Sequence, residues 1–371
     1  MDEKKTKALD KIREEINRIK DKKARVLFFV LDTKGVASGS LEYIYKLAKI
    51  AENDGYDVAM LYQAEKGEEF VGVEEWLGKD YSSMKHYNIA SEDFEILPSD
   101  VLFIPEIFSN VMNQTKKLPC KRIAILQNYN YMVEQMPFAA QWGDFGIIEC
   151  LTNTQHNADL IEDVFPYVKA KVVQPYLDSM FEPSFAPKKM VINIVAKDKS
   201  DVNKVVKPFY WKFPTFKWVS FRDLRGFPKH EFAELLKDAA ATVWIDDDTS
   251  FGYSALEAMK SGSIVIAKVP DAPLPWMDNG DAETMKNCCL WFDDYNALHR
   301  QIASVVRSWI TDKVPEEIFE EAKSTVEAFS ETETKTEFLT YLTDVFNARV
   351  NEMEILINNI IKKENENEQG E

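Results

Sequence analysis

The sequence lacks the features that would place it in a membrane, outside the cell or on a nucleic acid. No apolar run reaches the roughly 18 residues of a membrane-spanning helix, and the N-terminal stretch MDEKKTKALDKIREE has no apolar core of the kind found in secretion signals. The 45 Lys and Arg residues are outnumbered by 62 Asp and Glu, which gives a net charge of −17. This balance argues against broad DNA binding and against anionic membrane surfaces, although a local basic cleft is compatible with it.

Cysteine is also scarce. The four cysteines, Cys120, Cys150, Cys288 and Cys289, are too few and too scattered for a disulfide framework. The adjacent pair at 288 and 289 has no CxxC partner, so we expect no zinc site. Free thiols in a reducing compartment are the simplest account, and we therefore expect a cytoplasmic protein.

The chain does contain enough apolar residues for two folded domains. It has 371 residues, of which 45% are hydrophobic and 12% aromatic. Near the N-terminus, an apolar run at Arg25–Asp32 leads into a loop with Gly35, an amphipathic helix at Leu41–Glu52 and a second strand at Tyr56–Tyr62. This order predicts a β-loop-α-β unit of doubly wound type. The loop does not match GxGxxG, so dinucleotide binding is weakly supported and a tight turn that needs glycine is at least as good an explanation.

The rest of the chain repeats this alternation of strands and helices. Further strands are predicted at 100–104, 122–126, 146–150 and 170–173, and after a proline-rich segment at 175–187 at 190–195, 217–221, 242–245 and 263–267. Helices are predicted at 157–165, 230–240 and 296–310. The pattern predicts an α/β protein with two domains that face each other across a cleft, where ligands usually bind.

One stretch of the second half has the order expected of an anion site. In Thr242–Met259, TVWIDDDTSFGYSALEAM, an apolar strand runs into an acidic turn, then into small polar residues with Gly252, and then into a helix. Such an order directs backbone N–H groups and a helix N-terminus toward one point. The alternative is an ordinary helix start capped by Thr249 or Ser250.

These residues resemble the donor-binding element of GT-B glycosyltransferases of group 1, in which two Glu residues are separated by seven positions and L-E-A-M follows a glycine turn. Other segments resemble the same family in the same order: PYLDSMFEP at the turn between domains, LRGFPKHEFAELLKDAAATVWI before the donor site, NGDAETMKNCCLWFDDYNALHRQI after it, and VEAFSETETKTEFLTYLTDVF as the C-terminal helix. The loop GVASGS, which contains Gly35, resembles the glycine-rich acceptor-side loop. The resemblance implies a GT-B fold, with two Rossmann-like doubly wound domains and extra terminal helices.

The resemblance also divides the chain into five segments. They are an N-terminal helix (1–24), an acceptor-side domain (25–187), a nucleotide-sugar domain (188–330), a helix that crosses back to the first domain (331–350) and a helical or disordered acidic tail (351–371).

Within the donor site, the resemblance implies a role for several residues. Glu257 would bind the ribose hydroxyls of the donor, because a carboxylate accepts two hydrogen bonds from a diol; a helix-start Glu favoured by the helix dipole is the alternative. Ser250, Phe251 and Gly252 would present N–H groups to the diphosphate, with Tyr253 adding a side-chain bond. Thr249 stands where the family has its first Glu.

The resemblance assigns the remaining catalytic roles less directly. Asp248 is a candidate to replace the missing carboxylate, although a solvated turn explains it equally well. Lys197, and after it Lys204, would neutralise the leaving diphosphate in a retaining transfer that needs no metal or other cofactor. His156, at a predicted helix start in the first domain, is a candidate near the reacting centre, with a structural role as the stronger alternative.

The sequence therefore predicts a protein that binds a nucleotide-diphosphate sugar and transfers the sugar to an unknown acceptor. A first alternative is a catalytically degenerate relative with a structural or assembly role, in which the terminal helices make an oligomer. A second is a phage-type DNA-modifying sugar transferase, against which the acidic net charge argues. An epimerase of this fold would be expected to have an acidic, His-rich cleft, which the sequence does not show.

Overall fold

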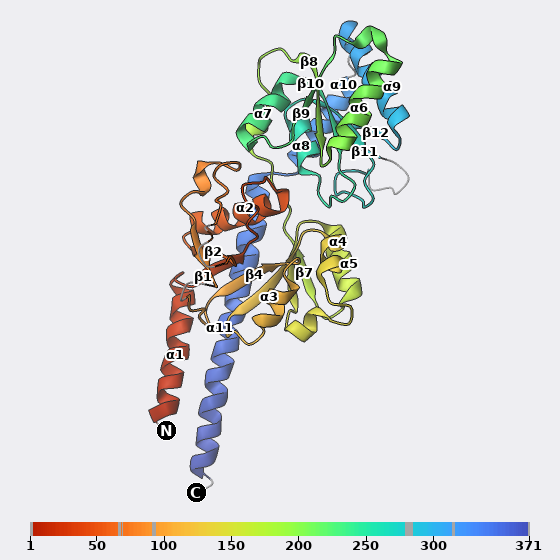
Figure 1. Ribbon diagram of the computed structural model, residues 1–371. Helices are drawn as coiled ribbons and strands as arrows, with labels where there is room; N and C mark the ends of the chain where they lie inside the picture. The colour runs from red at the N-terminus through yellow and green to blue at the C-terminus, as the bar shows by residue number, and fades with distance from the viewer. Residues whose placement is uncertain are drawn as a thin grey trace.

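The structure is a computed structural model that describes residues 3–65, 68, 70–90, 94–278, 285–313 and 316–369. It consists of two parallel α/β domains, one above the other in Figure 1, with the long helix α11 (Glu331–Gln369) running from their junction along the first domain. The predicted fold class, two doubly wound domains with added terminal helices, is confirmed.

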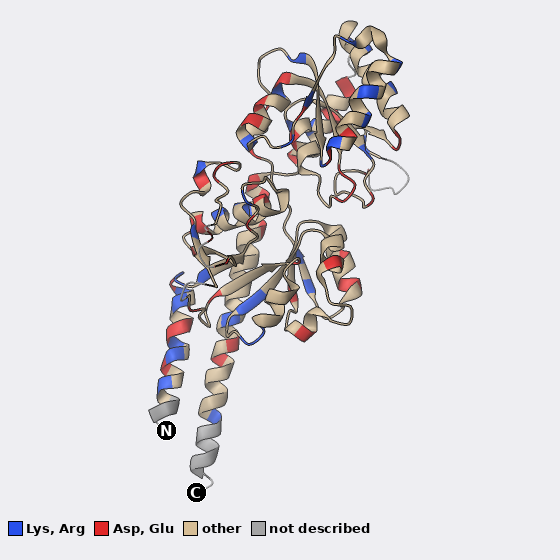
Figure 2. Ribbon diagram, viewed as in Figure 1, with Lys and Arg blue, Asp and Glu red and all other residues tan. Residues whose placement is uncertain are grey.

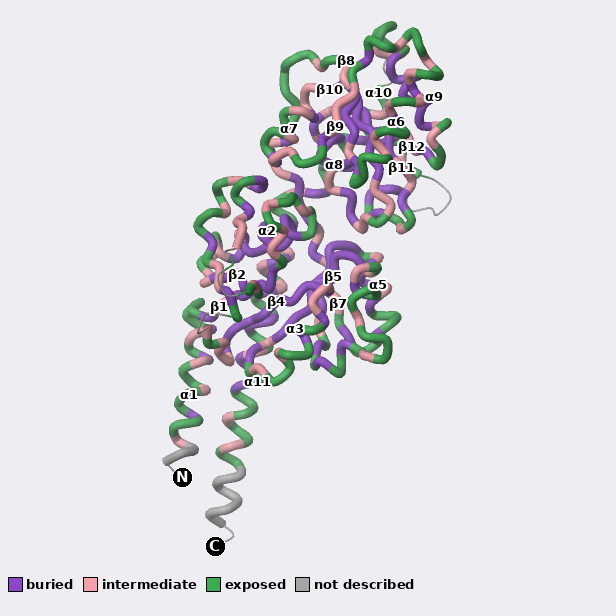
Figure 3. The backbone as a smooth tube through the Cα atoms, viewed as in Figure 1, coloured by how far each residue is buried: buried purple, intermediate pink, exposed green. Residues whose placement is uncertain are grey.

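The first domain is built on a seven-stranded parallel sheet of order β3-β2-β1-β4-β5-β6-β7. The strands are β1 (Arg25–Phe29), β2 (Asp57–Tyr62), β3 (Lys85–Asn88), β4 (Val101–Pro105), β5 (Lys121–Leu126), β6 (Glu149–Thr152) and β7 (Lys169–Val172). The helices are α2 (Gly39–Asn53), α3 (Ser109–Gln114), α4 (Tyr129–Gln135) and α5 (Gln155–Val164), with short 3-10 turns at Lys79–Tyr81 and Trp142–Phe145. The central strands are buried along nearly their whole length because helices cover both faces of the sheet (Figure 3).

The second domain is built on a five-stranded parallel sheet of order β12-β11-β10-β8-β9. The strands are β8 (Lys189–Ala196), β9 (Ser220–Asp223), β10 (Ala239–Ile245), β11 (Ile264–Lys268) and β12 (Leu290–Phe292). The helices are α6 (Lys199–Lys212), α7 (Lys229–Asp238), α8 (Tyr253–Lys260), α9 (Tyr295–Ile310) and α10 (Glu316–Glu327), with 3-10 turns at Ser179–Phe181 and Pro214–Phe216. The strand β10 is buried at every position, and its carboxyl end lies at the junction between the domains.

The chain crosses between the domains twice, and the two crossings lie side by side. The Leu177 N–H of the first crossing donates to the Phe329 carbonyl of the second at 3.2 Å. Next to it, the Thr334 hydroxyl donates to the Gln174 carbonyl at 2.8 Å. The first half of α11 then packs into the first domain through buried side chains that include Phe338 and Leu342.

The terminal helices extend beyond the globular body. The helix α1 (Glu3–Lys20) lies beside the lower part of α11, and an ion pair joins Lys20 to Glu354 at 3.3 Å. Basic and acidic residues alternate along α1 (Figure 2). Within the described chain, no helix has the length and apolarity needed to cross a bilayer.

Some predicted boundaries were wrong. The strand predicted at 146–150 begins at Glu149, because Gly146 adopts a left-handed conformation (φ 72°) that ends the preceding 3-10 turn. The edge strands β3 and β12 and the helices α3, α4 and α6 were not predicted. The tail expected to be helical or disordered continues α11 as helix to Gln369.

Candidate functional site

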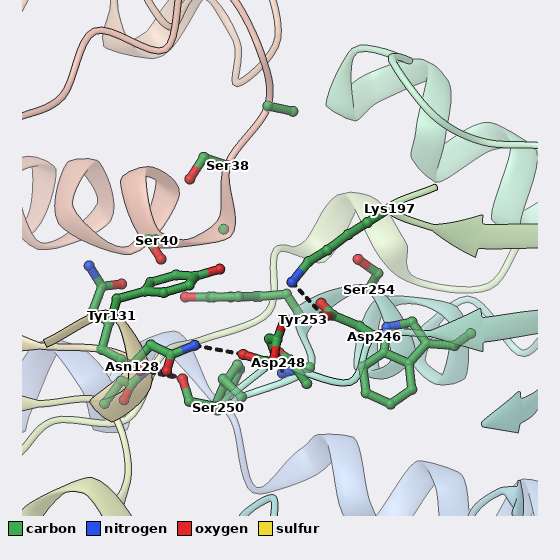
Figure 4. Close-up of a pocket in the computed structure, with 18 residues that line it drawn as sticks. Ser38, Ser40, Asn128, Tyr131, Lys197, Asp246, Asp248, Ser250, Tyr253 and Ser254 are labelled. Atoms are coloured by element: carbon green, nitrogen blue, oxygen red, sulfur yellow. Dashed lines mark hydrogen bonds and ion pairs between the residues drawn. The ribbon is translucent and has the colours of Figure 1, made fainter. Parts of the chain in front are cut away.

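The two domains enclose a pocket of about 310 Å³ between the carboxyl ends of their sheets (Figure 4). We call it the interdomain pocket. The first domain contributes Ala37, Ser38, Gly39, Ser40, Gln127, Asn128, Tyr131 and Asn153, and the second contributes Lys197, Trp244, Asp246, Asp248, Thr249, Ser250, Phe251, Gly252, Tyr253 and Ser254. This is the place where doubly wound sheets bind ligands.

The turn between β10 and α8 is fixed by its own contacts. The Gly252 N–H donates to the Thr249 hydroxyl at 3.0 Å, and Trp276 Nε1–H donates to the Phe251 carbonyl at 2.6 Å. Gly252 has a φ of 76°, and a Cβ at this position would lie 2.9 Å from Cζ2 of Trp276. Both the conformation and the packing therefore require glycine, which lets the turn lie close against its neighbours.

The helix α8 begins directly at the pocket. The first N–H groups of a helix have no partner within it, and Tyr253 and Ser254, the first two residues of α8, line the pocket. The ring of Tyr253 reaches the first domain, where a Cβ on Gly39 would lie 3.2 Å from its Cδ2 atom. The helix start thus presents unpaired donors to the space between the domains, a suitable position for an anion.

A lysine faces this helix start from the neighbouring strand. Lys197 follows β8, and its Nζ lies 2.7 Å from Oδ1 of Asp246. Burial opposes the charge of Lys197, but the hydrogen bond to Asp246 and the negative charges of Asp246 and Asp248 together outweigh burial and raise the pKa of the ammonium group. Burial raises the pKa of Asp246 in spite of Lys197. Among the described residues that line the pocket, Lys197 is the only basic one, and its side chain is 54% exposed.

Hydrogen bonds close the floor of the pocket across the domain boundary. Asn128 Nδ2–H donates to the Asp248 carbonyl at 2.6 Å, and the Ser250 hydroxyl donates to the Gln127 carbonyl. Behind them, the Asn128 N–H donates to the buried carboxyl of Glu106 at 2.9 Å. The acidic turn of the second domain therefore rests on the end of β5 of the first.

Five charged side chains, here called the junction cluster, are packed beside this contact. They are Glu42, Lys46, Asp178, Lys229 and Glu257. Lys229 Nζ contacts Glu42 and lies 2.7 Å from Glu257 Oε1 and 3.6 Å from Asp178 Oδ2, and Lys46 Nζ lies 2.7 Å from Glu42 and 3.1 Å from Asp178. The cluster joins α2 of the first domain to α7 and α8 of the second.

The carboxylates of the junction cluster differ in their surroundings. Glu42 is fully buried, which opposes its charge, but it lies between both lysines, and they lower its pKa to about 2. Glu257 has Lys229 as its close cationic partner, and burial raises its pKa. The negative charge of the cluster is therefore held more firmly on Glu42 than on Glu257.

Known proteins resemble this chain only distantly in sequence. No protein-family model matches it. Over 191 residues it is 22% identical to an α-1,6-glucosyltransferase of Actinobacillus pleuropneumoniae serotype 7, a region that covers 48% of this chain and 55% of that protein. The chain thus matches about half the length of this curated relative.

Solved structures resemble it over most of its length. Sucrose-phosphate synthase from Thermosynechococcus elongatus has a TM-score of 0.61 at 11% identity, over 88% of this chain and 100% of the other. A pneumococcal O-GlcNAc transferase in complex with UDP and GlcNAc has a TM-score of 0.60 at 9% identity, over 87% and 99%. The protein has the GT-B glycosyltransferase fold. The GT-B resemblance expected from the sequence is confirmed at the level of the fold.

The structure brings most of the predicted GT-B donor residues together and leaves others outside. The interdomain pocket is lined by Lys197, Asp248, Thr249, Ser250, Phe251, Gly252 and Tyr253. Glu257, Gly35, His156 and Lys204 do not line it. Glu257 is in the junction cluster, and Lys204 pairs with Asp201 at 2.8 Å on α6.

Two of these residues, Gly35 and His156, belong to the first domain and do not line the interdomain pocket. Gly35 (φ 80°) makes a turn near Val71, and the glycine that meets the second domain is Gly39. His156 is in the first turn of α5, while Asn153, just before that helix, lines the pocket. The GT-B assignments of these residues stay predictions.

Sequence reasoning missed several residues of the site. Ser38 and Ser40 belong to the small-residue loop whose glycine was singled out instead, and Asp246 was treated as part of a solvated turn. Glu106 was missed altogether, although an acidic residue directly after the apolar strand DVLFIP was a visible signal.

Proposed function

We propose that this protein transfers a hexose from a nucleoside-diphosphate sugar, bound in the interdomain pocket, to an acceptor hydroxyl. The observation that carries the proposal is the convergence of the Lys197 ammonium group and the N-terminus of α8 on one pocket between two GT-B domains. The helix start supplies a partial positive charge for a diphosphate, and the Lys197 ammonium group, which is paired with Asp246, would exchange that carboxylate for the diphosphate. The fold and the glucosyltransferase relative support the same reaction class.

The reaction requires stabilisation of a leaving diphosphate. The bond between the sugar C1 and the β-phosphate oxygen breaks, and its electron pair stays on the diphosphate. The acceptor oxygen bonds to C1, and its proton passes to the departing diphosphate. In this proposal Lys197 and the first-turn N–H groups of α8, at Tyr253 and Ser254, stabilise the developing charge without a metal or other cofactor. We propose retention of configuration on the resemblance alone.

To bind the ribose of the donor, Glu257 would have to keep its ion pair with Lys229 and accept hydrogen bonds from the ribose hydroxyls as well. Its Oε1 atom is paired with Lys229, and the residue is 4% exposed. Ribose hydroxyls would approach the other carboxylate oxygen, which requires the junction between the domains to open locally. Donor binding would then be coupled to domain motion, as is common when a ligand binds between domains.

The second candidate function is a protein that binds the nucleotide sugar without transferring it. Thr249 brings no negative charge to the pocket, and its hydroxyl accepts a hydrogen bond from Gly252. The nearest carboxylates, Asp246 and Asp248, belong to the same turn, and Asp246 is paired with Lys197. If no carboxylate reaches the sugar, this arrangement favours binding of the nucleotide sugar without its transfer.

Calorimetric titration with UDP, GDP and ADP tests the proposal. At least one nucleotide should bind the wild-type protein, and Lys197→Ala should weaken binding about tenfold or more, the usual cost of losing a charged hydrogen-bond donor. Lys207→Ala is the matched control, because Lys207 is an exposed lysine on α6 that does not line the pocket, and it should leave the affinity unchanged. Failure of all three nucleotides to bind rejects the proposal. Binding without hydrolysis or transfer of any donor sugar favours the second candidate.

A further inference from the structure

A second cavity adjoins the interdomain pocket within the first domain. It measures about 240 Å³ and shares four lining residues with the pocket: Ser38, Ser40, Gln127 and Tyr131. The other lining residues are Leu31, Thr33, Leu41, Ile44, Pro105, Glu106, Ile107 and Phe108. We call it the side cavity. Because it opens beside the donor residues and its other walls belong to the first domain, it is placed to hold the molecule that receives the sugar.

The walls of the side cavity are mostly aliphatic or aromatic, and one carboxyl lies among them. Glu106 follows β4 and is 2% exposed. One of its oxygens accepts the Asn128 N–H at 2.9 Å, and among the described residues no lysine, arginine or histidine forms an ion pair with it. Burial raises the pKa of Glu106 to about 7. Above this pH the buried carboxyl is ionised, and the carboxylate is a strong acceptor for a ligand hydroxyl.

The side cavity also lacks the groups that recognise phosphate. Among its described lining residues there is no lysine or arginine. A third cavity shares Leu31 and Phe108 with it and is lined by Asp32, Glu65 and Glu68; Lys34 pairs with Asp32 at 3.0 Å and with Glu68 at 3.7 Å. In the side cavity itself, an anionic acceptor would meet the ionised Glu106 carboxylate, and no lysine or arginine among the described lining residues compensates that charge. A neutral ligand would meet none of this repulsion.

We propose that the side cavity is the acceptor subsite and that it selects a neutral acceptor with an apolar ring that ends in a hydroxyl. The ring packs between Leu41, Ile44 and Phe108, and the hydroxyl donates a hydrogen bond to Glu106. A second hydroxyl of the same acceptor, the one that receives the hexose, then faces the interdomain pocket. This inference rests on the proposed function, because it names the class of acceptor for the same transfer.

Glu106 also has a structural contact that the test must separate from ligand recognition. Its bond to the Asn128 N–H supports the turn that carries Asn128 to Asp248 of the second domain. Glu106→Gln preserves this bond, because the amide oxygen of Gln accepts from the same N–H. The substitution removes the negative charge. If Glu106 recognises the ligand, binding of the ligand hydroxyl should weaken; if Glu106 only supports the turn, binding should not change.

The experiment is a calorimetric titration at pH 8, where Glu106 is ionised, in the presence of saturating UDP. It uses three probes: 4-hydroxyphenyl β-D-glucopyranoside, phenyl β-D-glucopyranoside and glucose 6-phosphate. The hydroxyphenyl glucoside should bind at least tenfold more tightly than the other two. Glu106→Gln should reduce this preference over the phenyl glucoside to about twofold or less. Thr33→Phe, which fills the side cavity, should abolish glucoside binding and leave UDP affinity unchanged.

Val36→Phe is the matched control, since Val36 lies in the same loop, is 67% exposed and does not line the side cavity. It should change neither affinity. The inference is overturned if glucose 6-phosphate binds as tightly as the hydroxyphenyl glucoside, if Thr33→Phe leaves glucoside binding intact, or if Glu106→Gln preserves the full preference. UDP binding without glucoside binding overturns this inference alone, whereas failure of the wild-type protein to bind UDP, GDP or ADP overturns the proposed function.

Discussion

Substitution of Lys229 by Met should destabilise the protein more than any surface charge change. Lys229 is 7% exposed and contacts three carboxylates, those of Glu42, Asp178 and Glu257. In the wild-type protein these carboxylates face two ammonium groups, and after the substitution only Lys46 remains. The variant therefore leaves buried negative charge without compensation, and the methionine side chain fills most of the lysine volume, so the effect is mainly electrostatic.

The size of the effect follows from the cost of breaking a buried ion pair. Removal of one partner typically costs about 3–5 kcal/mol. For a domain of this size, roughly 2–4 °C of melting temperature correspond to each kcal/mol, so the midpoint should fall by about 6–20 °C. Glu257 should become protonated in the variant, because burial already raises its pKa even with Lys229 present.

Thermal unfolding at pH 7.5, followed by circular dichroism, measures this effect. The double variant Lys229→Met with Glu257→Gln should recover at least half of the loss, because it removes one of the uncompensated charges. Lys237→Met is the control on the same helix: Lys237 pairs with the largely exposed Glu234, and its loss should cost less than about 1 kcal/mol. A Lys229→Met midpoint within 2 °C of the wild type would refute the view that the junction cluster is a buried, coupled unit.

Three further predictions concern packing and protonation. Gly252→Ala should cost about 2 kcal/mol more in urea unfolding than Gly226→Ala, because the two have nearly equal φ (76° and 78°) but only Gly252 lacks space for a Cβ; equal costs would contradict the packing argument. The pKa of Glu106 is raised from 4.5 to about 7, so between these pH values the folded state keeps a proton that the unfolded state loses, and stability falls as the pH rises. Relative to Glu106→Gln, the wild-type free energy of unfolding should fall by roughly 3 kcal/mol from pH 4.5 to 8, and a constant difference would argue against the raised pKa. Phe338→Ala should lower the free energy of unfolding by about 3–5 kcal/mol in chemical denaturation, because Phe338 packs α11 into the core of the first domain. Leu356→Ala, at a half-exposed position of the same helix, should cost less than about 1 kcal/mol, and similar costs for the two variants would contradict this role of Phe338.

The central strands could be predicted from the sequence because they are buried on both faces. Runs such as VLFFV and VWI stay apolar throughout, as is typical of buried parallel strands. The edge strand β3, Lys85–Asn88, was not predicted because it has a neighbour on one side only and remains partly exposed, so its polar sequence KHYN resembles a loop. The wrong start of β6 has a local cause, the left-handed Gly146, which no pattern of hydrophobicity reports.

The donor side of the candidate site was predicted better than its surroundings because it is contiguous in sequence. Residues 248–253 all line the interdomain pocket, as expected from the turn between β10 and α8. The junction cluster was not foreseen, since Glu42, Lys46, Asp178, Lys229 and Glu257 come from four distant segments that only the folded chain brings together. For the same reason, the ion pair between Glu257 and Lys229 could not be predicted from the motif around Glu257.

The most direct test of the account is a crystal structure of the protein soaked with UDP. The account predicts diphosphate oxygens within hydrogen-bond distance of Lys197 Nζ and of the first-turn N–H groups of α8, at Tyr253 and Ser254, in the pocket between the domains. A nucleotide bound elsewhere, for instance beside Lys204 on α6, with the interdomain pocket empty would contradict it.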